Sequence, residues 1–121
     1  MSVDISGVDI FKEERIMKPL SESTYLVLLA LYQEPLHGYG IIKMIDHISG
    51  GTFIIAPGTL YGILTNLVKQ QYIETLSEEK DSRKKKTYLL TDIGKAALLN
   101  EFNRYKTMVD FSNQILAEGK K

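Results

Sequence analysis

The sequence contains no cysteine, no tryptophan and only three prolines among 121 residues. Without cysteine the chain can form neither a disulfide framework nor a thiolate metal site, and this usage fits a reducing cytoplasm. Long hydrophobic runs are also missing, because the longest, Tyr25 to Tyr32, is far too short to span a bilayer. Residues 1–18 are acidic and polar, without the apolar core of a signal peptide. We therefore expect a cytoplasmic protein with no membrane partner.

An excess of charge of one sign is missing as well, since 15 basic and 15 acidic residues leave a formal net charge of zero. This balance argues against a surface that is positive all over, so any nucleic-acid site must come from local clustering. One such cluster exists, where four basic residues follow one another at 83–86. A run of this kind can also be ordinary solvated surface, and its position in the fold must distinguish the two readings.

Residues suited to catalysis or metal binding are scarce. The only histidines, His37 and His47, lie on or near one predicted helix with no ligand cluster beside them. Glu78 and Glu79 are neighbours in a loop rather than a placed acid–base pair, and no GxxxxGK[ST] phosphate loop occurs. We expect no enzymatic activity, no catalytic residue, no metal and no cofactor.

Hydrophobic periodicity and capping residues predict which secondary-structure elements the chain forms and in which order. The segment 9–18 could form a short helix before Pro19. The predicted elements that follow are a helix from Ser21 to about Gln33, a helix from Gly38 to Ser49, a brief strand or extended linker at 53–55, a helix from Pro57 to about Gln71, strands at 72–76 and 86–90, and a helix from Asp92 to about Glu118.

This order predicts a mainly α protein with a small β-hairpin, an α+β fold. The second and third helices are joined by a short link that contains glycine, and a hairpin follows the third, as in a winged helix-turn-helix with a long C-terminal dimerisation helix. We divide the chain into an N-terminal segment 1–19, which could be a short helix at the dimer interface, a DNA-binding domain 20–91 and a dimerisation helix 92–121.

The helix from Pro57 is the predicted reader of double-stranded DNA. Leu60, Leu64, Leu67 and two flanking apolar residues, Ile63 and Val68, form a face that anchors it. Its opposite face is small and polar, so it can approach base edges and phosphates closely. A plain amphipathic helix with a solvated face is the alternative. The predicted DNA contacts are Gly58, Gly62, Thr65, Asn66 and Lys69 on this helix, and Arg83, Lys84, Lys85 and Lys86 on the hairpin, where cations bind the phosphate backbone.

Three segments in this order, Leu36–Gly40 (LHGYG), Pro57–Tyr61 (PGTLY) and Leu90–Gly94 (LTDIG), resemble the PadR family over about Leu20 to Leu99. The resemblance implies a transcription factor, commonly a repressor, that binds a palindromic operator as a dimer. It also implies that Tyr61 and its neighbour Thr59 contact DNA. Gly62 stands where many members carry proline, and the wing is richer in consecutive lysines, so the operator sequence stays open.

With one helix after the wing, the chain looks like the short PadR subfamily, which includes multidrug-sensing repressors. Some of those repressors bind flat aromatic compounds between two tryptophans, and this chain has none. A small-molecule effector is therefore compatible with the resemblance, but its identity is unknown.

The last helix carries more apolar surface than one small domain can cover. A stripe of five residues recurs at spacings of 4, 3, 4 and 7, and three more apolar residues lie off it. A second subunit is the simplest cover, although the N-terminal segment, with Phe11 and Met17, could fold back instead. We predict a homodimer whose two third helices lie about one DNA turn apart. Its predicted interface residues are Leu98, Phe102, Tyr105, Val109 and Leu116 on the stripe, and Met108, Phe111 and Ile115 beside it.

A winged-helix protein-interaction module without DNA binding is the competing function. The basic wing favours DNA binding, whereas the zero net charge leaves room for the module. Specific, salt-sensitive binding to DNA distinguishes the two.

Overall fold

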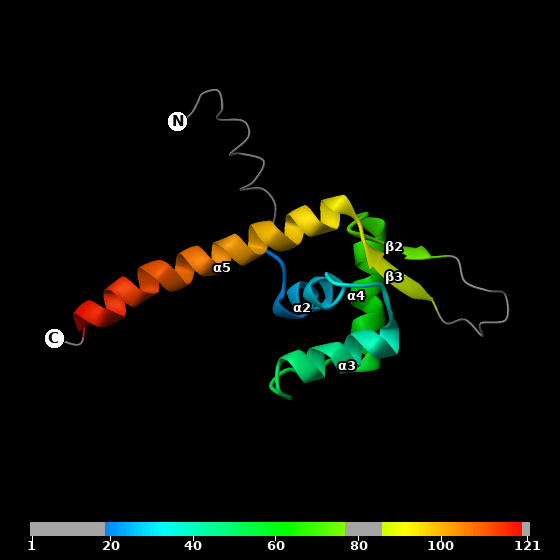
Figure 1. Ribbon diagram of the computed structural model, residues 1–121, viewed down its shortest axis with the longest axis horizontal. Coiled ribbons are helices and arrows are strands. Elements are labelled where there is room, and N and C mark those ends of the chain that lie inside the picture. Colours follow the sequence, from blue (N-terminus) through cyan, green and yellow to red (C-terminus); the bar gives the residue numbers. More distant parts are fainter. Residues whose placement is uncertain (1–18, 77–85, 120–121) are drawn as a thin grey trace, which may run out of the picture.

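The computed structural model describes residues 19–76 and 86–119. The predicted mainly helical fold with a small antiparallel sheet is confirmed, and Figure 1 shows a helical head from which one long helix projects. The predicted N-terminal helix and the tip of the wing lie outside the described residues. In chain order the elements are α2 (Glu22–Ala30), β1 (Leu36–His37), α3 (Gly38–Ile48), α4 (Pro57–Lys69), β2 (Ile73–Leu76), β3 (Thr87–Leu90) and α5 (Asp92–Gly119).

The sheet has three strands in the order β1-β3-β2, all antiparallel, rather than the two strands predicted. The predicted hairpin is the β2–β3 pair, in which Ile73 lies opposite Leu90. β1 adds the pair Leu36 and Tyr88 on the other side of β3. This strand was not predicted because two residues are too few to show an alternating pattern. Residues 53–55, for which the sequence allowed a strand or a linker, form no strand.

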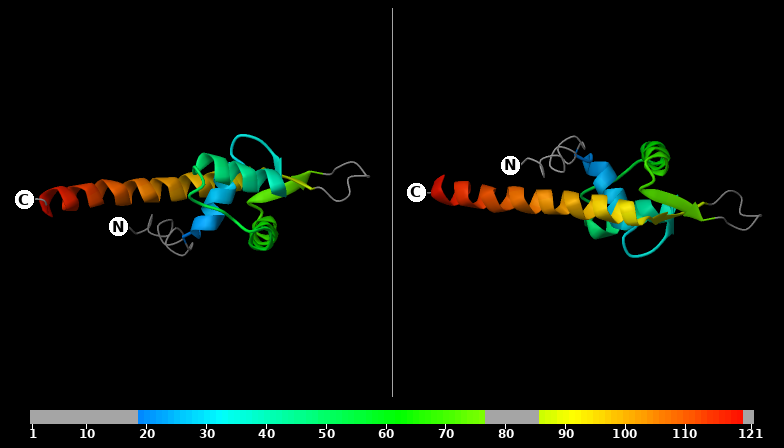
Figure 2. Two further views of the ribbon diagram at one scale, coloured as in Figure 1. Left: turned by 90° about the horizontal axis from the view of Figure 1, so that it is seen from below. Right: turned by 90° about the horizontal axis from the view of Figure 1, so that it is seen from above.

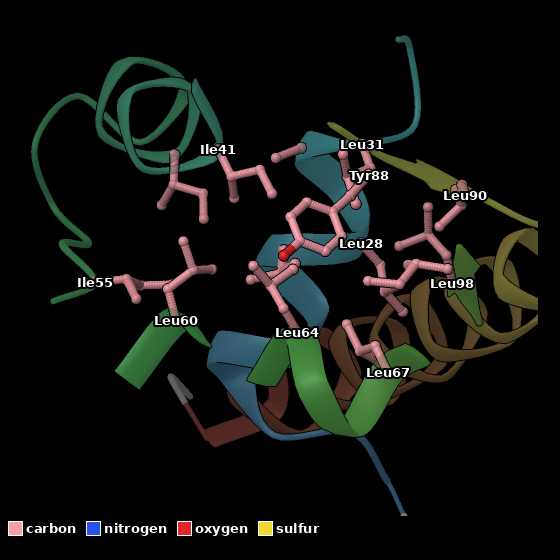
Figure 3. Packing of buried hydrophobic residues seen from close by; sticks show 14 residues of the cluster. Leu28, Leu31, Ile41, Ile55, Leu60, Leu64, Leu67, Tyr88, Leu90 and Leu98 are labelled. Atoms are coloured by element: carbon pink, nitrogen blue, oxygen red, sulfur yellow. The ribbon is translucent and has the colours of Figure 1, made fainter. Parts of the chain in front are cut away.

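The core is built around α2, whose apolar body packs against α3 on one side and α5 on another. Val27 and Leu28 are fully buried, and Figure 3 shows Tyr88 of β3 lying among side chains of α2 and α4. In α3 the i, i+3 spacing of Tyr39, Ile42, Ile45 and Ile48 predicts one apolar face, and this prediction is partly wrong. Tyr39 is 70% exposed and Ile48 47%, whereas Ile41 and Ile45 are fully buried, because α3 packs through the flank centred on those two residues.

The start of α5 is held firmly on the head by the LTDIG segment. The Thr91 hydroxyl caps the helix by accepting the Gly94 N–H at 3.0 Å, and it donates to the Gln71 carbonyl at 2.7 Å. A Cβ at Gly94 would collide with the carbonyl oxygen of Tyr72, so only glycine allows this approach. The predicted cap at Ser21 is also present, since its hydroxyl accepts the Thr24 N–H.

α4 runs across the direction of α5, as the perpendicular views in Figures 1 and 2 show. α4 and the strands leading to the wing lie at one end of the molecule, and the free end of α5 lies at the other. The surface that could read DNA and the surface that could pair subunits are therefore well separated. None of the helices that the structure describes is both long enough and apolar enough to cross a membrane.

Candidate nucleic-acid interface

α4 is two-faced, as predicted. Leu60, Leu64 and Leu67 are buried in the core, which fixes the helix and turns its other side outward. Val68, placed on the anchoring face by its spacing, is 39% exposed and lies at the edge of that face. The predicted contact residues on α4 all face solvent: Gly58, Thr59, Tyr61, Gly62, Thr65, Asn66 and Lys69.

One flank of α4 opens into a cleft that joins three elements. Tyr61 and Thr65 line it from α4, and Lys86 and Tyr88 line it from the arm of the wing. The remaining wall is the start of α3, which contributes His37, Gly38, Tyr39 and Gly40. The cleft therefore brings the reading helix, the base of the wing and a helix N-terminus onto one surface. Lys86 is the member of the basic run that the structure describes, and Arg83, Lys84 and Lys85 lie outside the described residues.

The Tyr61 side chain crosses this cleft to the backbone of α3. Its hydroxyl lies so near Gly38 that a Cβ there would be 2.8 Å from the oxygen. Tyr88 lies beneath it, and burial raises the pKa of the Tyr88 hydroxyl, with the neighbouring Tyr61 raising it further. Tyr61 is nevertheless 52% exposed. Its ring is thus supported on one side and presented to solvent on the other.

The first turns of α3 and α4 lack a side-chain cap, whereas those of α2 and α5 are capped by Ser21 and Thr91. The N-cap residues of α3 and α4, His37 and Ala56, make no capping hydrogen bond through a side chain. Unpaired N–H groups and the positive end of the helix dipole attract anions such as phosphate. The two helices of the helix-turn-helix are therefore the two that can offer their N-termini to a phosphate backbone.

The chemistry offered by Thr65 is narrower than its residue type suggests. Its hydroxyl donates to the Tyr61 carbonyl one turn earlier, at 2.9 Å. The side chain therefore presents an acceptor oxygen and a methyl group to a ligand. Both can meet base edges in the major groove, where amino groups donate and thymine carries a methyl group.

The structure does not bring every predicted contact into this cleft. Asn66 lies on the opposite flank of α4, where a second cleft separates α4 from α5. Lys69 belongs to the last turn of α4, away from its N-terminus. The α3 residues of the cleft were not predicted as contacts, although His37–Gly40 lie inside one of the segments that resemble the PadR family. Gly38 and Gly40, close together at a helix start without a capping residue, were the available signal.

Comparisons with known proteins agree with this geometry. The profile of the transcriptional regulator PadR-like family matches residues 27–100, which include the end of α2, all of α3, α4 and the sheet, and the start of α5. The chain belongs to the PadR-like family of transcriptional regulators. Members of this family are transcriptional regulators, not enzymes.

Two solved structures resemble this PadR-like chain over most of its head. A PadR family transcription regulator from Clostridium difficile is 23% identical, with a TM-score of 0.67, covering 79% of this chain and 99% of that one. Bacillus subtilis PadR in complex with operator DNA is 26% identical, with a TM-score of 0.59, covering 66% of this chain and 47% of that one. An uncharacterized 37.1 kDa protein in a Streptomyces fradiae transposon is 37% identical over 81 residues, and the match spans only 22% of its length.

The predicted pairing surface of this PadR-like protein divides into two parts along α5. Leu98 was wrongly placed at a subunit interface, because it is only 3% exposed and belongs to the core of its own head. Tyr105 is half-buried and packs edge-on against Tyr25 of α2, with ring centroids 4.9 Å apart. These residues lie where α5 still runs along the head.

Beyond the head, the same side of α5 is apolar and exposed. Met108 and Ile115 follow Glu101 at intervals of seven, so they continue the face that is buried on α2. Met108 is half-buried, whereas the remaining predicted interface residues are exposed by 47 to 67%: Phe102, Val109, Phe111, Ile115 and Leu116. Leu99, which was not predicted, is also 47% exposed, but it lies on nearly the opposite side of α5 from Glu101 and does not belong to this face. In the described part of the chain, nothing covers this face.

Acidic, histidine and cysteine side chains do not gather into a metal-binding group anywhere in residues 19–76 and 86–119. Among the same residues, the groups with a clear pKa shift are three wholly or partly buried tyrosines and the ion pair of Glu101 with Arg104, and none of them lies in a cluster of catalytic type.

Proposed function

We propose that this PadR-like protein is a homodimeric repressor that binds a palindromic operator in double-stranded DNA. The observation that supports it best is the cleft in which Tyr61 and Thr65 of α4 meet Lys86 and the start of α3. Because these groups open on one side, α4 can enter a major groove while the wing reaches the neighbouring backbone. The relative from Bacillus subtilis in complex with operator DNA supports the same mode of use.

The residues of this surface divide by chemistry. A Cβ added at Gly58 or Gly62 would have nothing within 4 Å of it, so the helix surface there is open and flat and can lie close to base edges. Thr65 offers groups that read bases from the cleft side of α4, Asn66 offers its amide from the opposite flank, and Tyr61 offers a hydroxyl to a phosphate. Lys69, Lys86 and the run Arg83–Lys85 supply positive charge that displaces counterions from the backbone.

Pairing through α5 supplies the second reading head. The exposed apolar face beyond the head, with Val109, Phe111, Ile115 and Leu116, is too large to leave in water. A second copy of α5 presents the same face, and a two-fold axis then relates the two α4 helices. A palindromic operator follows, because its two half-sites are related by the same symmetry.

The decisive experiment is selection of binding sites from random duplex DNA, followed by a salt titration with the selected sequence. We expect a two-fold symmetric sequence, and an affinity that falls linearly with salt on a double-logarithmic plot. Neutralising Arg83, Lys84, Lys85 and Lys86 together weakens binding to all sequences and flattens this slope. The matched control neutralises Lys95 and Lys106, which lie on α5. Failure to select any sequence would leave the interaction module as the better function.

A second arm tests Tyr61. Tyr61→Ala should weaken operator binding without lowering the melting temperature, because the side chain is half-exposed. A large fall in melting temperature would instead make Tyr61 part of the core. For repression itself, a reporter gene placed behind the selected operator should be expressed less when the protein is present.

A further inference from the structure

Among residues 19–76 and 86–119, Glu101 is the only buried charged side chain, at 4% exposure. Both of its carboxylate oxygens are paired with one guanidinium: Arg104 Nε reaches Oε1 at 3.1 Å and Nη2 reaches Oε2 at 2.8 Å. The backbone of Leu20 and the Tyr105 hydroxyl lie near the carboxylate and, after Arg104, help to lower its pKa. Glu101 is therefore buried where α5 meets the segment that leads into α2.

Aromatic packing reinforces the same place. The Tyr105 ring meets the Tyr25 ring of α2 edge to face, and the Arg104 guanidinium lies 5.5 Å from the centre of the Tyr105 ring. We call this set, Leu20, Tyr25, Glu101, Arg104 and Tyr105, the α2–α5 junction. It lies at the point where α5 leaves the head, since the apolar residues that follow Tyr105 on that face become exposed.

α5 is not held by α4 along this stretch. A cleft of about 460 Å³ separates them, with Asn66 and Gln70 on one wall and Glu101 and Arg104 on the other. The helix is thus fixed to its head along its first half, at its start by Thr91 and Gly94, in the core by Leu98, and last at the α2–α5 junction. If this last contact is loosened, the part of α5 beyond it can change its direction relative to the head.

The direction of α5 matters for a protein that reads two half-sites, and this step depends on the function proposed above. About 14 residues follow Tyr105 in α5, or roughly 21 Å of helix. A pivot of about 10° over that length displaces a head by roughly 3.5 Å, which is about one base-pair step. Small changes at the α2–α5 junction therefore become errors of a whole base pair at the operator.

We propose that Glu101 is a positioning residue that sets the half-site spacing this regulator accepts. Its carboxylate is buried at the contact with the segment before α2 and is oriented there by both nitrogens of Arg104, so it favours one angle of α5, whereas a purely apolar contact would let the two helices slide. Buried ion pairs contribute little net stability but can select one arrangement among several. The residue does not touch DNA and acts only through the placement of α5.

The test compares selected operators whose half-sites stand at the native spacing, one base pair closer and one base pair farther apart, together with an isolated half-site. The proteins are wild type, Glu101→Gln and Tyr105→Phe. The last change removes the hydroxyl that lies near the Glu101 carboxylate and keeps the aromatic ring against Tyr25. Glu118→Gln, on an exposed turn of the same helix, is the matched control. Analytical ultracentrifugation and circular dichroism check that each protein is dimeric and folded.

We expect wild type and Glu118→Gln to lose about tenfold or more in affinity when the spacing changes by one base pair, as for a mismatch. For Glu101→Gln, the affinities for the three spacings should lie within about threefold of each other. This variant should lose affinity for the operator of native spacing and keep the wild-type affinity for the isolated half-site. The dependence of affinity on spacing should be intermediate for Tyr105→Phe. A folded, dimeric Glu101→Gln that keeps the wild-type spacing profile would overturn the proposal.

If Glu101→Gln does not fold, Tyr105→Phe decides alone, and a wild-type profile for it would count against the proposal. The outcome for the wild-type protein separates this proposal from the proposed function. A wild type that binds no two-half-site DNA, or binds it without regard to spacing, contradicts the homodimeric reader itself rather than the role of Glu101.

Discussion

The Tyr61 hydroxyl on α4 lies directly against Gly38 at the start of α3, close enough that a Cβ on Gly38 would be 2.8 Å from the oxygen. The two helices of the helix-turn-helix are therefore in contact at the point where both can meet DNA. The lack of a side chain at Gly38 decides where the tyrosine ring can lie, so this position offers a direct test of the proposed interface.

Gly38→Ala should displace the Tyr61 ring without unfolding the protein, because the atom in the way is the far end of a movable side chain and alanine favours a helix start. We expect operator affinity to fall by about tenfold, the loss of roughly one hydrogen bond to a charged group. Gly119→Ala is the control, since its Cβ would meet nothing within 4 Å and the position lies at the far end of α5, away from the cleft. Equal affinities for the two variants in a fluorescence titration would show that the position of Tyr61 is unimportant.

Gly62→Ala should make the protein more stable and a poorer DNA binder. The position is in the middle of α4 and nothing lies within 4 Å of an added Cβ, so the gain in helix propensity is about 1 kcal/mol. The added methyl group projects from the face proposed to lie in the groove. Chemical denaturation and operator titration measure the two effects. Gly119→Ala, in equally open surroundings at the far end of α5, should leave affinity unchanged, and similar affinities for both variants would argue against the reading face.

Ile115→Glu should separate the proposed dimer into folded monomers. Ile115 is 64% exposed on the free half of α5, and two copies of a charge would be buried in a symmetric interface. We expect the dimer dissociation constant to rise by about two orders of magnitude, as for a central interface residue. Ile93→Glu introduces the same change at a 54% exposed position on the first turn of α5. Sedimentation should show dissociation only for Ile115→Glu, and an unchanged dimer would contradict pairing through this face.

The stability contributed by Glu101 should depend on pH in the acid range. The Arg104 guanidinium, through its hydrogen bonds, holds the pKa of the Glu101 carboxyl below the ordinary value of 4.5, although burial acts in the opposite direction. Because the folded-state pKa is lowered, the contribution is complete above that ordinary value and is lost as the pH falls through the folded-state pKa.

Glu101→Gln should therefore be less stable than wild type at neutral pH by about 1–2 kcal/mol, a modest figure because Arg104 remains partly exposed. The difference should shrink steadily as the pH is lowered below 4.5. Urea denaturation of both proteins across this range measures it. A difference that stays constant with pH would mean that the loss comes from packing and not from the carboxylate charge.

Most helices could be predicted because their signals are local. Ser21 and Thr91 are residue types that favour helix N-caps, and they cap α2 and α5, while Pro57 begins α4 as predicted. These features depend on residues within one turn of each other, so the chain specifies them without its tertiary context. The errors at helix ends are small for the same reason: α2 ends at Ala30 rather than near Gln33, before the turn that leads to Pro35.

The sequence predicted the part of the candidate site that lies on α4 but not the part that lies at the start of α3. The outward face of α4 followed from its periodicity, and Tyr61 followed from the PadR resemblance. The start of α3 was missed because its role in the cleft depends on β3, which brings Lys86 and Tyr88 beside it from about fifty residues away. No local pattern reports a contact across that distance.

The amino-acid sequence alone determined the order of the elements, the two-faced character of α4 and the family, because periodicity, caps and short motifs act within a few residues. The tertiary structure alone decided that Leu98 belongs to the core of the head, that Tyr61 leans on Gly38, and that Glu101 is buried at the junction with α2. The physical reason is that burial depends on which surfaces meet. Along α5 one continuous face is covered by α2 in the first half of the helix and exposed in the second half. The heptad spacing of the residues on this face is the same in both halves, so the sequence pattern does not distinguish the buried half from the exposed half.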